Sequence, residues 1–169
     1  MQAVILAGGK GTRLRPYSTV FPKPLMPIGE YPIVEVVVRQ LKYHGATDII
    51  FAVGYLKELI QAFFNHGEKW DVNISYSSEN KPLGTAAPIR LIKDLQDDFL
   101  VMNGDVLTNL DYDNFFQFHR KNQAMCTIAM YKKPVYIDLG VLEIDENNCL
   151  NDYIEKPTLH YDVSMGVYA

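Results

Sequence analysis

A glycine-rich segment near the amino terminus carries the residue types that bind phosphate. Three glycines fall within residues 8–11, directly after an apolar run at residues 3–7 that is typical of a buried strand. Glycines at the carboxyl end of a strand let backbone N–H groups approach an anion that a Cβ atom would keep away. Arg13, Arg15 and Lys23 add cationic side chains, and Lys23 stands between two prolines. The segment therefore predicts binding of a polyphosphate, and so a chemistry that uses nucleotides.

Two better-known glycine motifs do not account for this segment. No Gly-Lys pair in it is followed by Ser or Thr, as a Walker A loop requires. A dinucleotide-binding fingerprint needs a third glycine where Leu14 stands, and a helix where residues 16–27 contain four prolines. This excludes an NAD-dependent oxidoreductase. The remaining alternative to a phosphate loop is a surface turn with solvated arginines.

A second segment places a carboxylate at the end of another buried strand. Residues 98–102 predict the strand, and Asn103, Gly104 and Asp105 follow it. Ligands of open α/β sheets bind beyond the carboxyl ends of the strands, so we expect Asp105 and the glycine segment to face one crevice. A carboxylate beside a triphosphate suits Mg²⁺, which makes Asp105 the predicted metal ligand. The alternative is an aspartate that caps a turn after Gly104.

The ordered set of short motifs resembles that of the sugar-1-phosphate nucleotidyltransferases, and it is most similar in character to the mannose-1-phosphate guanylyltransferases. That family has a Rossmann-like, glycosyltransferase-A-type core. Each motif alone is weak, but together they extend over the whole chain in the family's order. The matching segments are residues 6–16, 22–24, 83–86, 103–105, 140–141, 155–157 and 166–168.

The resemblance implies roles for individual residues. Arg13 would stabilise charge on a leaving pyrophosphate, Lys23 would lie between the α-phosphate and the sugar phosphate, and Asp105 would hold Mg²⁺. Gly140, Glu155 and Lys156 would contact the sugar 1-phosphate. The nucleotide-binding positions implied by the same resemblance are Leu6, Ala7, Gly8, Gly9, Gly11, Thr12, Glu79, Gly84 and Thr85.

The base is the finer question that this resemblance raises. The family places a base-recognition side chain five residues before the glycine at position 84, which is Glu79 here. A carboxylate offers two acceptors, which complement the N1–H and N2–H₂ edge of guanine, whereas uracil- or thymine-specific relatives tend to carry glutamine. We therefore expect GTP with mannose 1-phosphate or a manno-configured heptose 1-phosphate. The alternatives are UTP or dTTP with glucose 1-phosphate, and a non-catalytic regulatory subunit that binds a nucleotide sugar.

Composition restricts the function classes further. The net charge of −4 and the absence of a basic stripe argue against a nucleic-acid binder. No apolar run approaches the ~18 residues of a membrane span, and the first residues do not resemble a signal peptide. Cys126 and Cys149 have no metal-type spacing and indicate reduced thiols in a cytoplasmic protein. The expected partners are a nucleoside triphosphate and a sugar 1-phosphate. Whether the chain also forms a homo-oligomer is left open by the sequence.

The elements that must position these residues follow from hydrophobic periodicity. It predicts an α/β fold with a Rossmann-like, doubly wound mixed sheet, in a single domain over residues 1–169. The family resemblance implies a nucleotide-binding part over about residues 1–110 and a sugar-binding part over about 111–169. Asn147 and Asn148 predict a hairpin turn, and Asp113 the start of a helix. Strands are expected at 2–7, 48–53, 72–77, 98–102, 124–131, 139–145, 149–154 and 163–168, and helices at 32–44, 57–65, 84–95 and 113–121.

The last residues predict a strand that stops part-way. The family resemblance would place a second metal-binding aspartate after residue 169, so we expect a carboxyl-terminally truncated domain whose sugar-binding part is incomplete.

Overall fold

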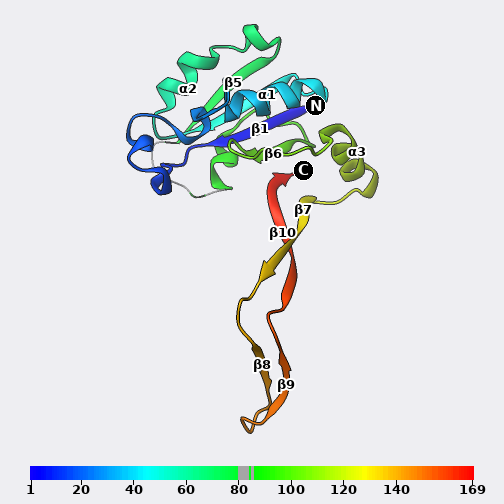
Figure 1. The fold of residues 1–169 in the computed structure, drawn as a ribbon. Coiled ribbons are helices and arrows are strands. Elements are labelled where there is room, and N and C mark those ends of the chain that lie inside the picture. Colours follow the sequence, from blue (N-terminus) through cyan, green and yellow to red (C-terminus); the bar gives the residue numbers. More distant parts are fainter. Residues whose placement is uncertain (80–83, 85) are drawn as a thin grey trace. The chain divides into compact units, whose positions relative to one another are not determined.

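The fold was taken from a computed structural model, which describes residues 1–79, 84 and 86–169. The chain divides into two compact units, one formed by residues 1–128 with 166–169 and the other by residues 129–165 (Figure 1). Residues 80–83 and 85 lie outside the described residues, and Leu83 and Thr85 of the predicted 83–86 motif are among them.

The first unit contains the helices and the parallel strands. Its strands are β1 (Gln2–Ala7), β2 (Pro27–Ile28), β3 (Tyr31–Pro32), β4 (Asp48–Val53), β5 (Asn73–Ser78) and β6 (Leu100–Asn103). Its α-helices are α1 (Ile33–Tyr43), α2 (Lys57–Phe64) and α3 (Tyr112–Asn122). Its 3₁₀ turns are η1 (Thr12–Leu14), η2 (Tyr17–Thr19), η3 (Lys23–Leu25), η4 (Glu68–Trp70) and η5 (Ala87–Leu91).

No helix in the described part of the chain is both long enough and apolar enough to cross a membrane.

The central sheet is mostly parallel and brings the ends of its strands into line. The strand order is β5-β4-β1-β6, followed by β10 (Thr158–Tyr168) and β7 (Ile128–Tyr136). The first four strands are parallel, and β10 runs antiparallel to β6. Ala7 pairs with Val53 on one side of β1, and Leu6 pairs with Asn103 on the other. The predicted α/β fold is therefore confirmed, and the segments that follow β1, β4 and β6 leave the sheet at one edge.

Both faces of the sheet are covered, as buried parallel strands require. On one face a buried cluster packs against apolar side chains near η5: Val4, Ile50, Ala52 and Val101 with Ile89, Ile92 and Leu95. Strand residues alternate between faces, so Phe51 points to the other side. There it is fully buried, with its ring 5.0 Å from that of Phe64 in α2.

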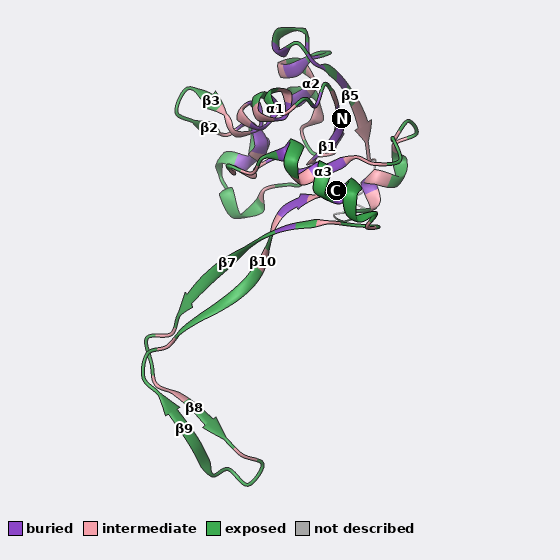
Figure 2. Ribbon diagram, turned by 90° about the vertical axis from the view of Figure 1, so that its right-hand side faces the viewer, coloured by how far each residue is buried: buried purple, intermediate pink, exposed green. Residues whose placement is uncertain are grey.

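The second unit is a β ribbon. Within it, β8 (Val141–Ile144) and β9 (Leu150–Ile154) pair as an antiparallel hairpin. The predicted turn at Asn147 and Asn148 is confirmed, because Asn148 has a positive φ and Asp145 accepts hydrogen bonds from the amides of Asn147 and Cys149. Figure 2 shows that residues 129–165 are almost entirely exposed, whereas the buried residues gather in the first unit.

Some predicted elements are wrong in type or extent. The segment predicted as a helix over 84–95 forms only the 3₁₀ turn η5 within its described residues. Pro88 explains the difference, because a proline lacks the amide that an α-helix over 84–95 would need at this interior position and fits instead at the start of a short turn. The strands predicted at 124–131 and 163–168 are β7 and β10, which extend over 128–136 and 158–168. The boundaries of the two units do not test the predicted division near residue 110, which stays a prediction.

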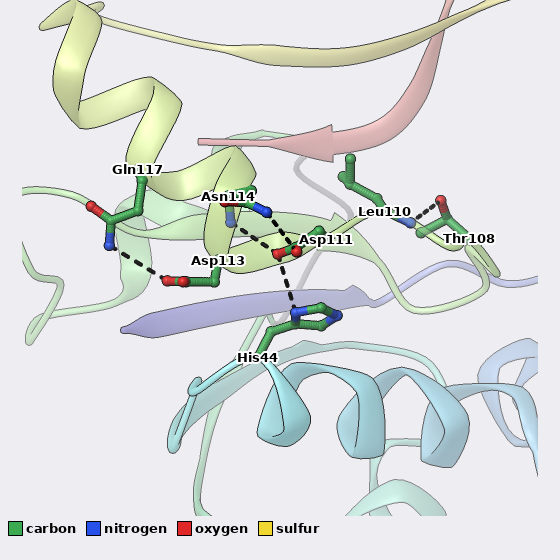
Figure 3. Close-up of polar contacts among 7 residues, drawn as sticks. All are labelled: His44, Thr108, Leu110, Asp111, Asp113, Asn114 and Gln117. Atoms are coloured by element: carbon green, nitrogen blue, oxygen red, sulfur yellow. Dashed lines mark hydrogen bonds and ion pairs between the residues drawn. The ribbon is translucent and has the colours of Figure 1, made fainter.

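The amino-terminal cap of α3 is also corrected. The cap is Asp111 and not Asp113, because Asp111 Oδ1 accepts the amide of Asn114 at 2.9 Å (Figure 3). The same carboxylate lies 3.3 Å from Nδ1 of His44, the residue that follows α1. Asp113 lies one residue inside the helix and accepts from Gln117 instead.

We expect Asp111→Ala to lower the melting temperature by about 2–4 °C, because an amide at the start of α3 loses its acceptor. The amide of Asn114, with a smaller contribution from His44, holds the pKa of Asp111 below its usual value. A carboxyl group with a lowered pKa stabilises the fold above its unfolded-state pKa and loses that contribution as the pH falls through its folded-state pKa. The difference in melting temperature should therefore be full at neutral pH and shrink below about pH 4.

Circular dichroism melts across this pH range measure the difference. Asp111→Asn is the matched control, since asparagine also caps helices well and should remain close to the wild type at neutral pH. A difference between Asp111→Ala and the wild type that does not change with pH would contradict the assignment of the cap.

Candidate functional site

The segment after β1 forms a largely exposed turn. Gly11 adopts the left-handed conformation, with φ of 58°, and begins the 3₁₀ turn η1. Among the described residues, no hydrogen-bond acceptor is assigned to the backbone amides of residues 9–13. Consecutive free amides in such a turn form a concave site for an anion.

Glu79 lies against the backbone where β1 and β4 end. An ideal Cβ atom on Gly8 would lie 3.0 Å from Oε1 of Glu79, and one on Gly54 would lie 3.2 Å from the same oxygen. The amide of Glu79 donates to the carbonyl of Val53 at 3.2 Å, which fixes this residue at the end of β4. The structure thus brings a predicted base-recognition side chain to the start of the predicted phosphate loop.

Asp105 and Lys23 form an ion pair beside the same loop. The amide of Gly104 donates to the carbonyl of Leu6 at 3.0 Å, so the residues after β6 lie against β1. An ideal Cβ atom on Gly11 would lie 3.3 Å from Cβ of Lys23, which places this lysine next to the loop. The glycine turn, a cation and a carboxylate therefore occupy one edge of the sheet.

The ion pair remains open to a ligand. The side chain of Lys23 is 42% exposed and that of Asp105 is 27% exposed. Arg13 is exposed in η1, and no ion pair involving it occurs within the described residues. A polyphosphate in the turn would meet Lys23 and Arg13 without first displacing a buried salt bridge.

The donors present fit Mg²⁺ only together with a substrate. No group of three His, Cys, Asp or Glu side chains that could hold a metal occurs in the part of the chain that the structure describes. Mg²⁺ commonly binds through one or two carboxylates together with phosphate oxygens and water. Asp105 supplies one such carboxylate at the predicted phosphate site.

The predicted sugar-phosphate residues lie together in the second unit. The hydroxyl of Tyr153 donates to Oε2 of Glu155 at 2.6 Å, and this hydrogen bond raises the pKa of Tyr153. An ideal Cβ atom on Gly140 would lie 2.3 Å from the same hydroxyl, so Tyr153 covers Gly140. Lys156 pairs with Asp138 at 3.0 Å. These contacts bring Gly140 and Glu155 to one aromatic side chain, while their role in sugar binding stays a prediction.

Two positions of the 83–86 motif, Gly84 and Thr85, were predicted to bind nucleotide. Of these, Gly84 lies in the described part of the chain, where it is exposed with φ of 92°.

Sequence reasoning missed two residues that the structure places at the loop. Gly54 follows β4 and, like Gly8, contacts Glu79. The sequence did offer a signal for Gly54, because it is a glycine directly after a buried strand, as Gly8 is after β1. Ser18 lies beneath Gly11, and nothing in the sequence marks it, since a serine in a loop is ordinary.

The fold and this edge define a class: α/β proteins with a Rossmann-like, mostly parallel sheet that places its ligand site at the carboxyl ends of the strands. Within that class, the chain belongs to the nucleotidyl transferase family, whose model matches residues 2–169.

The chain is similar to several named relatives. It is 36% identical to the mannose-1-phosphate guanyltransferase of Yarrowia lipolytica, over 99% of this chain and 48% of that protein. It is 34% identical to the UTP–glucose-1-phosphate uridylyltransferase of Synechocystis, again over 99% of this chain and 48% of that protein. The chain thus spans about half the length of these curated relatives.

Solved structures also match nearly the whole of this chain. The crystal structure of HddC from Yersinia pseudotuberculosis matches with a TM-score of 0.73 and 28% identity, covering 99% of this chain and 75% of that one. Its complex with GMP-PN matches with a TM-score of 0.67 and 27% identity, over the same shares of the two chains.

Proposed function

We propose that this chain carries the nucleotide-binding edge of a sugar-1-phosphate nucleotidyltransferase. The observation that supports this most directly is the Lys23–Asp105 ion pair beside the glycine turn, since it places a carboxylate and a cation next to backbone amides that have no acceptor within the described residues. Family membership over residues 2–169 supports the same reaction class. The product would be a nucleoside diphosphate sugar, released together with pyrophosphate.

In the proposed reaction, an oxygen of the sugar 1-phosphate attacks the α-phosphorus of the triphosphate in line. A new O–P bond forms, the bond to the β-phosphate oxygen breaks, and pyrophosphate leaves. No covalent intermediate with the protein is needed, so the protein's work is positioning and neutralising charge.

The residues of this edge divide that work. The amides of residues 9–13 would hold the phosphates, and Arg13 would stabilise charge that develops on the pyrophosphate. Lys23 would meet the α-phosphate and the incoming sugar phosphate as a point charge. Asp105 would hold Mg²⁺ together with phosphate oxygens and water, and the ion would supply further charge neutralisation when bound.

GTP is the proposed nucleotide, with mannose 1-phosphate or a manno-configured heptose 1-phosphate as its partner. Glu79 presents its carboxylate beside Gly8, where two acceptors suit the hydrogen-bonding edge of guanine. One relative is a mannose-1-phosphate guanyltransferase, and one similar structure binds GMP-PN. The uridylyltransferase relative supports the alternative of UTP with glucose 1-phosphate.

Pyrophosphate release tests the proposal directly. The chain is incubated with Mg²⁺, one of ATP, GTP, CTP, UTP or dTTP, and either mannose 1-phosphate or glucose 1-phosphate. Release with GTP and mannose 1-phosphate is the expected result. Release only with UTP or dTTP and glucose 1-phosphate would overturn the choice of base and sugar. Binding of GDP-mannose without release in any combination would favour the non-catalytic subunit.

Glu79→Gln should change base selection. We expect kcat/KM for GTP to fall about 10-fold relative to that for UTP, because one carboxylate acceptor becomes an amide donor facing guanine. Initial rates with the two nucleotides measure the ratio. Glu58→Gln is the matched control, since Glu58 is exposed in α2 and lies outside the proposed site. An unchanged ratio in Glu79→Gln would remove Glu79 from base recognition.

A further inference from the structure

Ser18 is a buried polar residue in the loop that follows the glycine turn. It is only 3% exposed, and its Oγ atom has no hydrogen-bond partner within the described residues. Buried hydroxyls in folded proteins are nearly always hydrogen-bonded, because an unsatisfied one carries its desolvation cost without compensation. Such an atom indicates a partner that arrives in another state of the protein.

The location of Ser18 indicates which state that is. Ser18 is the central residue of η2, and it lies directly behind the glycine turn. An ideal Cβ atom on Gly11 would lie 3.2 Å from Cβ of Ser18 and 3.8 Å from its Oγ. The same position lies 3.3 Å from Cβ of Lys23, so Ser18 and Lys23 flank one turn of backbone.

The turn itself also has unused groups. The amides of residues 9–13 lack acceptors within the described residues and lie in a largely exposed loop, where a ligand can reach them, whereas the hydroxyl behind the loop is buried. The N–H and C=O groups of one peptide unit point in opposite directions. A hydroxyl that binds a loop carbonyl from behind therefore orients the N–H of that peptide towards a ligand in front.

We propose that Ser18 is a positioning residue for polyphosphate binding. Its hydroxyl donates to a backbone carbonyl of the turn at Gly11 when the phosphates are bound, and so holds the amide of the same peptide towards them. Ser18 does not touch the ligand and acts through the loop. This inference rests on the proposed function, because it assumes that the loop binds a polyphosphate.

Ser18→Ala separates this role from a structural one, because the two roles predict opposite effects. Removing an unsatisfied buried hydroxyl should leave the melting temperature of the ligand-free protein unchanged or raise it. The same change should weaken the binding of GTP and of inorganic tripolyphosphate about 10-fold, and leave guanosine binding unchanged. Calorimetric titration with these three probes, combined with thermal melts, measures both effects.

Two further variants make the result specific. Ser18→Thr keeps a hydroxyl and should restore most of the affinity for tripolyphosphate. Thr19→Ala removes an exposed hydroxyl from the same turn, one that already bonds to the carbonyl of Pro16, and should not change the affinity.

The outcomes distinguish the two proposals. Wild-type affinity of Ser18→Ala for tripolyphosphate would overturn the role of Ser18 alone. A lower melting temperature with equal losses for guanosine and tripolyphosphate would show a structural role and also overturn it. If the wild-type chain bound neither GTP nor tripolyphosphate, the proposed function would fail, and the inference about Ser18 with it.

Discussion

Replacing Asp105 with alanine is expected to slow nucleotidyl transfer about 10²–10³-fold, which is the usual loss when one preorganised electrostatic group is removed from a reacting centre. Asp105 follows β6 at the edge where the glycine turn lies, and it pairs with Lys23. Its loss removes the carboxylate proposed to hold Mg²⁺ and leaves Lys23 without its partner. Arg13→Ala should cause a loss of the same order, because it removes a cation that acts on the leaving group.

The role of Asp105 in binding Mg²⁺ can be measured separately from the reaction rate. Titration of Mg²⁺ in the presence of GTP should show weaker apparent metal affinity in Asp105→Asn than in the wild type. Asp71→Asn is the matched control, since Asp71 is an exposed aspartate paired with Lys42 and lies outside the proposed site. Wild-type rates in both Asp105→Ala and Arg13→Ala would remove the roles assigned to these residues.

The Lys23–Asp105 contact predicts a coupled effect. Residues in direct contact commonly show interaction energies, so their single-variant effects do not add. The double variant Lys23→Ala with Asp105→Ala should therefore lose less activity than the product of the two single losses. Purely multiplicative losses would indicate that the two side chains act independently in the reaction.

The second large effect is on stability, at Gly67 between α2 and β5. Gly67 has φ of 94°, and an ideal Cβ atom there would lie 2.3 Å from the carbonyl oxygen of Val72 and 2.9 Å from Cγ1 of Ile74. Its carbonyl also accepts the amide of Trp70 at 2.9 Å, so the turn cannot move without disturbing that buried side chain. We expect Gly67→Ala to lower the free energy of unfolding by about 3 kcal/mol or more, from left-handed strain together with overpacking.

Gly45→Ala is the matched control for this variant. Gly45 also has a positive φ, of 84°, but an ideal Cβ atom there meets nothing within 4 Å among the described residues. It should lose only the conformational part, about 1–2 kcal/mol. Urea unfolding of both variants measures the difference. Equal losses would show that the contacts with Val72 and Ile74 relax at little cost.

The sequence by itself predicted the features that depend on short stretches of chain. Alternating apolar runs located the parallel strands to within one or two residues, and the glycine and proline pattern located the loop after β1. The rule that ligands bind at the carboxyl ends of parallel strands also predicted that Asp105 would share an edge with this loop. Periodicity failed at residues 84–95, because the apolar spacing outweighed Pro88, which disfavours an α-helix interior.

Only the tertiary structure decided which side chains meet at that edge. The pairing of Lys23 with Asp105 and the contact of Glu79 with Gly8 and Gly54 join residues far apart in the chain. Such contacts depend on strand order, on register and on the path of each loop, and none of these is encoded locally. The burial of Ser18 is the clearest case, since a loop serine carries no sequence signal and becomes informative only when the fold encloses its hydroxyl beneath Gly11.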